Sequence, residues 1–200
     1  GIGVPILLGA MPDALETIIQ RFRGNIFPGD VFVLNDPDDG GMHLPDVFVF
    51  KPVFSGETLI GFSGVVAHHQ DVGGRVPGGN AVDSTEIFQE GLQIPPLKLY
   101  SRGEANATLL SLWLRNVRIP DIVLGDIQAQ VAACHVGEQG LLQLAKRHSI
   151  DGLQVLMDEI LDYTEWRIRT AISEMPGGVY TFVDHIDDDG FGSGPIAISV

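Results

Sequence analysis

Residues 47–67 read VFVFKPVFSGETLIGFSGVVA, and the architecture of the chain can be worked out from this stretch. Two apolar runs, residues 47–50 and 58–67, flank a turn built from Ser55, Gly56 and Glu57. Short apolar runs bounded by turn-forming residues are typical of buried strands. If the two strands pair as an antiparallel hairpin, the residues before the first strand and after the second come to the same end of the sheet.

A histidine and an aspartate stand directly before the first of these strands. His43 and Asp46 are three residues apart, with Pro45 between them. Proline argues against a helix interior, because its ring blocks the preceding turn and it has no N–H to donate. We therefore expect this pair in a turn that enters the strand, where both side chains can aim at one point.

A second polar group, which contains His68, His69 and Asp71, follows the other strand. Successive side chains of a strand point to opposite faces, so one imidazole is expected at the site and the other beside it, as a supporting or substrate contact. We favour His68 as the imidazole that joins the first pair. Asp71, Asp36 or a group outside this chain would supply a further ligand.

These residue types suit a divalent metal ion. Neutral imidazole and carboxylate are the ligands that hard and borderline divalent ions prefer. Two histidines and one or two carboxylates leave a coordination position open for water, as a hydrolytic site requires. Paired glycines at residues 40–41 and 73–74 allow the backbone to approach a bound ion closely. The same spacing also fits polar loop residues that cap turns, and the H-E-x-x-H zinc motif is absent, so spacing alone leaves both interpretations open.

The composition excludes some classes of protein. A net charge of −14, with only 12 Lys and Arg among 200 residues, argues against a nucleic-acid surface and against binding to an anionic membrane. No apolar run reaches the length of a membrane span, and there is no signal-peptide pattern. The single cysteine, Cys134, cannot form an internal disulfide, so we expect a cytoplasmic protein. The chain opens without an initiator Met, and the alternating apolar run at residues 196–200 stops at the last residue. Both features favour a piece of a longer protein.

The order of the predicted elements favours an α+β fold in one domain, residues 1–200. Residues 1–100 are expected to be rich in strands and loops, residues 101–176 helical, and residues 177–200 the start of a further strand region. The individual elements predicted are helices at 14–22, 106–116, 121–147 and 153–175, strands at 31–34, 180–184 and 196–200, and a long loop at 73–96.

Other polar features carry weaker signals. Glu86 and Glu90, in the long loop, are candidate acid/base groups, although a role in capping the loop is as good an explanation. The acidic turn at residues 187–190 lacks the full calcium-loop pattern and is best explained as a solvated turn. Cys134 lies on an apolar helical face and is expected in the core. The G-x-x-x-x-G-K-[ST] loop is absent, so the sequence offers no P-loop for ATP.

The motifs at residues 29–37, 40–46, 68–74 and 86–96 resemble those of the hydantoinase B/5-oxoprolinase family. The resemblance extends through residues 116–120, 125–130 and 187–190, and it covers nearly the whole chain in consistent order. It implies the metal-bearing part of a two-component, ATP-dependent enzyme of the N-methylhydantoinase type. The expected partner is a hydantoinase A-like ATPase subunit or domain with an actin-like fold, so a hetero-oligomer is expected.

The resemblance also implies a chemistry and a ligand set. In the family the partner phosphorylates a carbonyl oxygen of a cyclic amide such as a hydantoin or 5-oxoproline, and the B part opens the ring with water. The metal ligands implied are His43, Asp46 and His68, with a carboxylate that would precede Gly1, and the ion would be zinc, manganese or iron. His69 or Asp71 would position or deprotonate the water.

Two alternatives stay open. Some relatives of the family carboxylate ketones, so the chain could be a subunit of an ATP-dependent ketone carboxylase. The segment from His43 to Asp46 leans towards the hydrolase branch of the family. The other alternative is a non-catalytic interface module whose site holds no ion.

Overall fold

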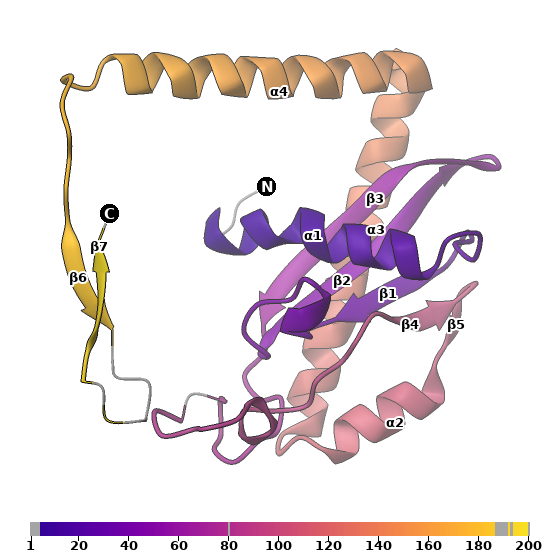
Figure 1. The fold of residues 1–200 in the computed structure, drawn as a ribbon. Helices are drawn as coiled ribbons and strands as arrows, with labels where there is room; N and C mark the ends of the chain where they lie inside the picture. Colours follow the sequence, from indigo (N-terminus) through magenta and orange to yellow (C-terminus); the bar gives the residue numbers. More distant parts are fainter. Residues whose placement is uncertain (1–4, 80, 187–191, 193, 200) are drawn as a thin grey trace. The chain divides into compact units, whose positions relative to one another are not determined.

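The computed structural model describes residues 5–79, 81–186, 192 and 194–199 (Figure 1). Its helices and antiparallel strands confirm the predicted α+β class. The α-helices are α1 Pro5–Arg21, α2 Ala107–Arg115, α3 Pro120–His148 and α4 Ile150–Ser173, and the short 3₁₀ helices are η1 Pro37–Asp39 and η2 Ile87–Gln89. The strands are β1 Val31–Leu34, β2 Asp46–Ser55, β3 Thr58–His68, β4 Leu97–Ser101, β5 Glu104–Ala105, β6 Val183–Ile186 and β7 Ile196–Ser199.

The chain divides into two compact units, Gly1–Ile150 and Asp151–Val200. The first unit contains a five-stranded sheet in the order β3-β2-β1-β4-β5, in which every neighbouring pair is antiparallel. Strands β2 and β3 form the predicted hairpin, with Ser55 opposite Thr58 near its tip and Asp46 opposite His68 at its open end. The expectation that the two polar groups reach the same end of the sheet is therefore confirmed.

Alternation along the strands divides the core of the first unit into two layers. Val31, Val33, Val47 and Val49 face one way and belong to a cluster with Trp113 of α2 and residues of α3. The intervening aromatic and leucine side chains face the other way and pack with α1; they are Phe32, Leu34, Phe48 and Phe50. Figure 1 shows the same sandwich, with α1 in front of the sheet and α3 behind it. A two-residue period with apolar side chains on both faces is what a sheet covered on both sides requires.

Three elements differ from the sequence-based expectation. Helix α1 begins at Pro5 rather than at residue 14, and it includes Pro12 instead of starting after it. Packing of Ala14 and Ile18 against the sheet outweighs the hydrogen bond that Pro12 cannot make. Strands β4 and β5 were not predicted, because they are only five and two residues long and lie between the long loop and α2.

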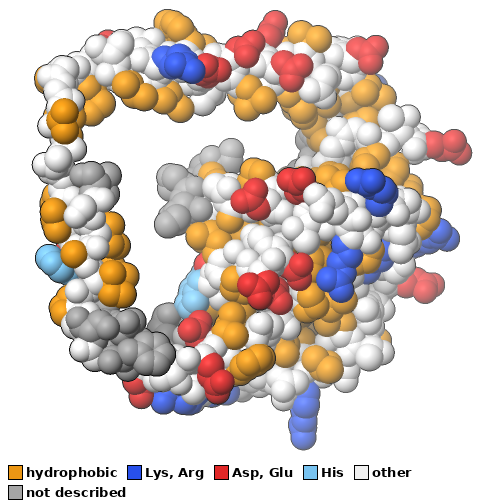
Figure 2. All heavy atoms as spheres, in the orientation of Figure 1, with side chains coloured by type: hydrophobic (Ala, Val, Ile, Leu, Met, Phe, Trp, Pro, Cys, Tyr) orange, Lys and Arg blue, Asp and Glu red, His pale blue; other side chains and the backbone are white. Residues whose placement is uncertain are grey.

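The second unit consists of α4 and the β6–β7 hairpin. Leu153 is its one buried side chain among the residues that the structure describes. Figure 2 shows hydrophobic side chains uncovered along α4. The exposed apolar residues of this helix include Ile160, Leu161 and Ile168. The acidic turn at 187–190 lies outside the described residues. In the part of the chain that is described, none of the helices combines the length and the apolar character that crossing a membrane demands.

Candidate metal centre

The register of the hairpin builds the site. Asp46 and His68 are direct partners across β2 and β3, and His68 Nδ1 lies 2.8 Å from Asp46 Oδ1. A carboxylate can only accept, so in the neutral ring Nδ1 carries the proton and Nε2 keeps its lone pair. His43 joins them from the turn before β2, with its ring centroid 5.6 Å from that of His68. One potential ligand atom from each of the three residues lies within 4.8 Å of the others.

The donor set and its spacing fit a divalent ion. Two atoms that each lie about 2.1 Å from a tetrahedral ion are about 3.4 Å apart. Separations of up to 4.8 Å therefore need only small side-chain adjustments to reach that geometry. The carboxylate of Asp46 has two oxygens, so the hydrogen bond from His68 leaves one oxygen for an ion. Two imidazoles and one carboxylate would leave positions for water or substrate.

The turn that carries His43 is held by a buried asparagine. The side chain of Asn35 donates to the carbonyl oxygens of Leu44 (2.7 Å) and Leu92 (2.9 Å), and it accepts from the N–H of Ile94 (2.6 Å). The N–H of Asp46 donates to the carbonyl of His43 at 2.7 Å and closes the turn. Asn35 thus joins this turn to the end of the long loop.

His69 lies in the core, on the opposite side of the strand from His68, as alternation requires. The residue is 1% exposed, its Nε2 lies 2.8 Å from Oε1 of Gln130, and its ring stacks on Trp113 with centroids 5.8 Å apart. Burial lowers the pKa of His69 below its ordinary value of 6.5, so the ring is neutral at physiological pH. The structure does not bring this residue into the group formed by His43, Asp46 and His68.

Asp71 is buried and engaged elsewhere. Its carboxylate accepts from the backbone N–H of Arg118 and from Arg118 Nη1 at 3.0 Å, and also from the N–H of Gly73. Arg118 further donates to the carbonyls of Gly73 and Gly74. Asp36, the other candidate for a further ligand, caps η1 by accepting from the N–H of Asp38 at 3.0 Å. Neither aspartate belongs to the three-residue group.

A hollow of about 250 Å³ opens beside the site. It is lined by His43, Gly79, Ala81, Val82 and Glu90. Glu90 is thus the ionisable side chain of the long loop that shares a space with a predicted ligand. Glu86, the other candidate acid/base group, precedes η2 and makes no side-chain cap hydrogen bond.

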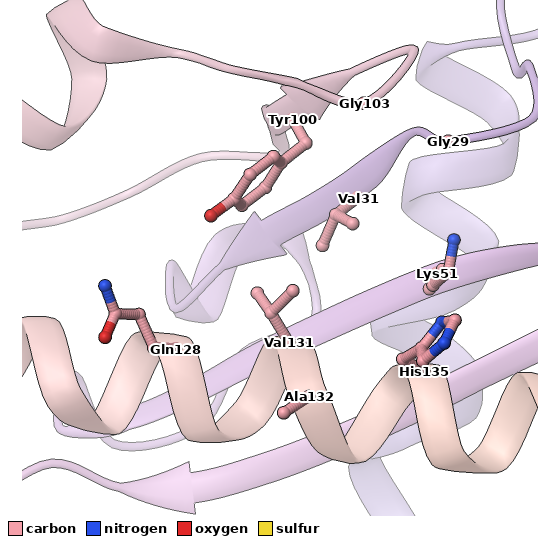
Figure 3. Close-up of a pocket in the computed structure, with 9 residues that line it drawn as sticks. All are labelled: Gly29, Val31, Lys51, Tyr100, Gly103, Gln128, Val131, Ala132 and His135. Atoms are coloured by element: carbon pink, nitrogen blue, oxygen red, sulfur yellow. The ribbon is translucent and has the colours of Figure 1, made fainter.

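A second hollow, of about 420 Å³, lies between α3 and the sheet (Figure 3). Val31 and Tyr100 of the sheet and Val131 of α3 supply its walls, and Lys51 and His135 stand at one end. None of the predicted ligand or catalytic residues lines it, so it is separate from the candidate metal centre.

Sequence reasoning missed three side chains that organise this region: Asn35, Arg118 and Gln130. For Gln130 a signal was present, because it falls between the core positions Ile127 and Cys134 on one face of α3. A polar residue on an otherwise apolar face indicates a specific buried hydrogen bond. Its partners could not be named, because they lie 61 and 83 residues away.

Known proteins resemble this chain in sequence over its whole length. Residues 1–200 match the model of the family described as Hydantoinase B/oxoprolinase. Caprolactamase subunit beta of Pseudomonas jessenii is 35% identical over 199 residues, which cover 100% of this chain and 34% of that protein. The chain therefore spans about a third of the length of this curated relative.

Two solved structures share the fold. The crystal structure of ATP-dependent caprolactamase from Pseudomonas jessenii matches with a TM-score of 0.85 and 34% identity, covering 100% of this chain and 35% of that one. A nucleotide-free structure of acetone carboxylase, which carries out ATP-dependent acetone carboxylation, matches with a TM-score of 0.70 and 26% identity, covering 76% of this chain and 20% of that one. The same fold thus occurs in enzymes named for two different ATP-dependent reactions.

Proposed function

Because the chain belongs to the hydantoinase B/oxoprolinase family, we propose that it carries the divalent-metal site of an ATP-dependent enzyme that opens cyclic amides with water. The observation that carries this proposal is the convergence of His43, Asp46 and His68 within 4.8 Å at the open end of the hairpin. The named activity of the caprolactamase relative, on a cyclic amide and with ATP, supports the same reaction class.

The chemical problem explains the need for such a site. An amide carbonyl is a poor electrophile, and phosphorylation of its oxygen provides a good leaving group. What remains to be supplied is a nucleophile at neutral pH. When bound, a zinc, manganese or iron ion supplies Lewis acidity, which lowers the pKa of water from about 16 towards 7.

The residues around the site have different proposed roles. His43, Asp46 and His68 are the proposed ligands. Glu90 faces the hollow that His43 also lines, where it can hold or move a proton on the substrate. His69 and Asp71 are the residues predicted to position or deprotonate the water. Their contacts favour an anchoring role instead, in which both hold the segment after β3 in place.

The phosphorylation step is assigned to a partner. The sequence has no P-loop, and the relatives include a subunit of a multi-subunit enzyme and structures of ATP-dependent enzymes. We propose a hydantoinase A-like ATPase subunit or domain as that partner, in a hetero-oligomer. The substrate class proposed is a hydantoin, 5-oxoproline or a similar lactam.

The second candidate function is ketone carboxylation. The fold shared with acetone carboxylase, at 26% identity over 76% of this chain, supports it. An activated ketone would then meet a carbon electrophile at the site in place of water. The higher identity and fuller coverage of the caprolactamase structure favour the hydrolase.

The test uses the full-length protein with its ATPase partner. ATP-dependent turnover is measured with hydantoin, 5-oxoproline and caprolactam, and in parallel with acetone and bicarbonate. We expect ring opening with the cyclic amides, about one divalent ion per chain, and loss of both in His43→Ala. The matched control is His135→Ala, because His135 is an exposed histidine on α3 that pairs with Glu138. Turnover of ketones alone would replace the hydrolase by the carboxylase, and a metal-free, inactive complex would favour the interface module.

A further inference from the structure

Gln130 connects the two strand ends that carry the proposed ligands. It lies on α3 and is buried, with 3% of the residue exposed. Its Nε2 donates to the carbonyl of Val47 at 2.8 Å, and its Oε1 lies 2.8 Å from Nε2 of His69. Val47 directly follows Asp46, and His69 directly follows His68. One amide group therefore binds the neighbour of each ligand in the Asp46–His68 pair.

The two hydrogen bonds fix each other's direction. The carbonyl of Val47 can only accept, so the atom of Gln130 that faces it must be the amide nitrogen. The oxygen of Gln130 is then left to accept, so Nε2 of His69 must carry the proton. Only one orientation of the amide and one tautomer of the imidazole satisfy both contacts.

This connection adds a directional restraint to the end of β3, beside the backbone hydrogen bond from the N–H of His69 to the carbonyl of Pro45. One face of the ring stacks on Trp113, and among the residues that the structure describes Nδ1 has no hydrogen-bond partner. Near Gln130, α3 contacts this face of the sheet through apolar side chains such as Val123 and Ile127. Its other polar contacts with β2, Cys134 with Val49 and Glu138 with Lys51, lie further along the helix. Apolar packing holds the helix against the sheet, but it is not directional.

We propose that Gln130 is a positioning residue for the metal site, which sets the separation and orientation of Asp46 and His68 through Val47 and His69. This inference rests on the proposed function, because it assumes that the two residues bind an ion. Groups that orient metal ligands are worth about 10- to 100-fold in affinity. Removing both hydrogen bonds of Gln130 is expected to act at the lower end of that range, since it acts on the neighbours of the ligands.

The experiment uses the full-length protein and the metal alone. Zn²⁺ affinity is measured by competition with a chelator, and the visible spectrum of the Co²⁺ form reports the ligand geometry. Gln130→Leu removes both hydrogen bonds at similar volume. Gln130→Glu keeps an acceptor for His69 but loses the donor to Val47. It takes the place of Gln130→Leu in the experiment if that variant does not fold.

Two controls share the helix. Gln128→Leu makes the same change at an exposed position two residues away. Cys134→Ala weakens the same helix-to-strand packing one turn further on, where Cys134 Sγ lies 3.5 Å from the carbonyl of Val49. Both controls are expected to bind Zn²⁺ as the wild type does, even if Cys134→Ala lowers the melting temperature.

The outcomes separate the two proposals. A roughly tenfold loss of Zn²⁺ affinity with an altered Co²⁺ spectrum in the Gln130 variants, but in neither control, is the expected result. If the wild type binds Zn²⁺ and the Gln130 variants bind it with unchanged affinity, this inference alone is overturned. An equal loss of Zn²⁺ affinity in Cys134→Ala would also overturn this inference alone. A wild-type protein that binds no Zn²⁺ would overturn the proposed function and this inference with it.

Discussion

At the scale of single residues, Asp46 is the most shielded of the three proposed ligands. Its side chain is 7% exposed, against 50% for His68, and His68 is the hydrogen-bond partner of its carboxylate among the described residues. A buried carboxylate is costly unless a cation or several donors compensate it. The proposed divalent ion would supply that compensation.

Asp46→Asn is therefore expected to separate metal binding from folding. The amide keeps the size of the side chain but removes the charge, so the metal content should fall at least tenfold while the metal-free protein stays as stable as the wild type. Elemental analysis and thermal unfolding measure the two effects. Asp83→Asn, at an exposed carboxylate that pairs with Arg75, is the control and should keep full metal content. Full occupancy in Asp46→Asn would remove Asp46 from the ligand set.

Cys134 gives a pH dependence whose sign can be worked out. Burial raises the pKa of its thiol from 9.0 to about 12, so between these values the unfolded chain loses the proton and the folded chain keeps it. The contribution of the thiol to stability is complete below pH 9 and is lost as the pH rises towards 12.

The measurement compares wild type with Cys134→Ala by urea unfolding at pH 8 and pH 10. The difference in free energy of unfolding between the two proteins should shrink by about 1 kcal/mol at the higher pH. An unchanged difference would mean that the thiol ionises as freely in the folded protein as in the unfolded chain.

At the scale of elements, the sequence was sufficient for the hairpin and for the ends that carry the ligands. The apolar runs and the turn at Ser55–Gly56–Glu57 predicted β2 and β3, and the antiparallel rule then predicted that His43, Asp46 and His68 share one end. The alternation rule also correctly separated His68 from His69. These inferences succeeded because they depend on local pattern and on one pairing between strands that are neighbours in sequence.

The remaining features depend on contacts between distant parts of the chain. Asn35 bonds to Leu92 across 57 residues, and Arg118 bonds to Asp71 across 47. The periodicity of apolar residues along the sequence carries no information about such distant pairs, so the anchoring of Asp71 could not be predicted. Pro12 misled the prediction of α1 for a similar reason, since packing against the sheet keeps the helix intact around it.

The long loop after β3 offers a matched pair of glycines. Gly74 and Gly78 both have positive φ, 77° and 80°. A side chain at Gly74 would overlap with the carbonyl oxygen of Glu90, whereas nothing lies within 4 Å of a side chain at Gly78. The absence of a side chain at Gly74 therefore lets its backbone lie close to the backbone of Glu90. Gly78 is needed only for the positive φ of its turn.

Gly78→Ala is expected to cost about 1 kcal/mol, from conformational strain alone. Gly74→Ala should cost about 1–3 kcal/mol more, and it should also lower turnover by displacing Glu90. Chemical denaturation and the ATP-dependent assay measure the two effects. Equal losses in both variants would show that the contact with Glu90 has no energetic weight.

At the scale of the whole molecule, the two compact units differ in how much core they contain. The unit Gly1–Ile150 has two buried clusters, one on each side of the sheet. The unit Asp151–Val200 has a single buried side chain, Leu153, among its described residues. An isolated helix with so little buried surface is marginal in water.

The two units are therefore expected to behave differently as separate fragments. Residues 1–150 should unfold cooperatively, and residues 151–200 should show far less helix by circular dichroism than the part of α4 from residue 151 to Ser173 would give. Thermal and urea unfolding followed by circular dichroism are the measurements. A stable, native-like helix content in 151–200 alone would show that local propensity suffices for α4.

The length of the hairpin has a practical consequence for engineering. Strand β2 is ten residues long, so its turn at Gly56 and Glu57 lies roughly 30 Å from Asp46. The register also shifts between Val53 and Phe54, two residues before the turn. An epitope or a fluorophore attached at this exposed tip would leave the end with the proposed ligands untouched, and it would report assembly with the proposed ATPase partner.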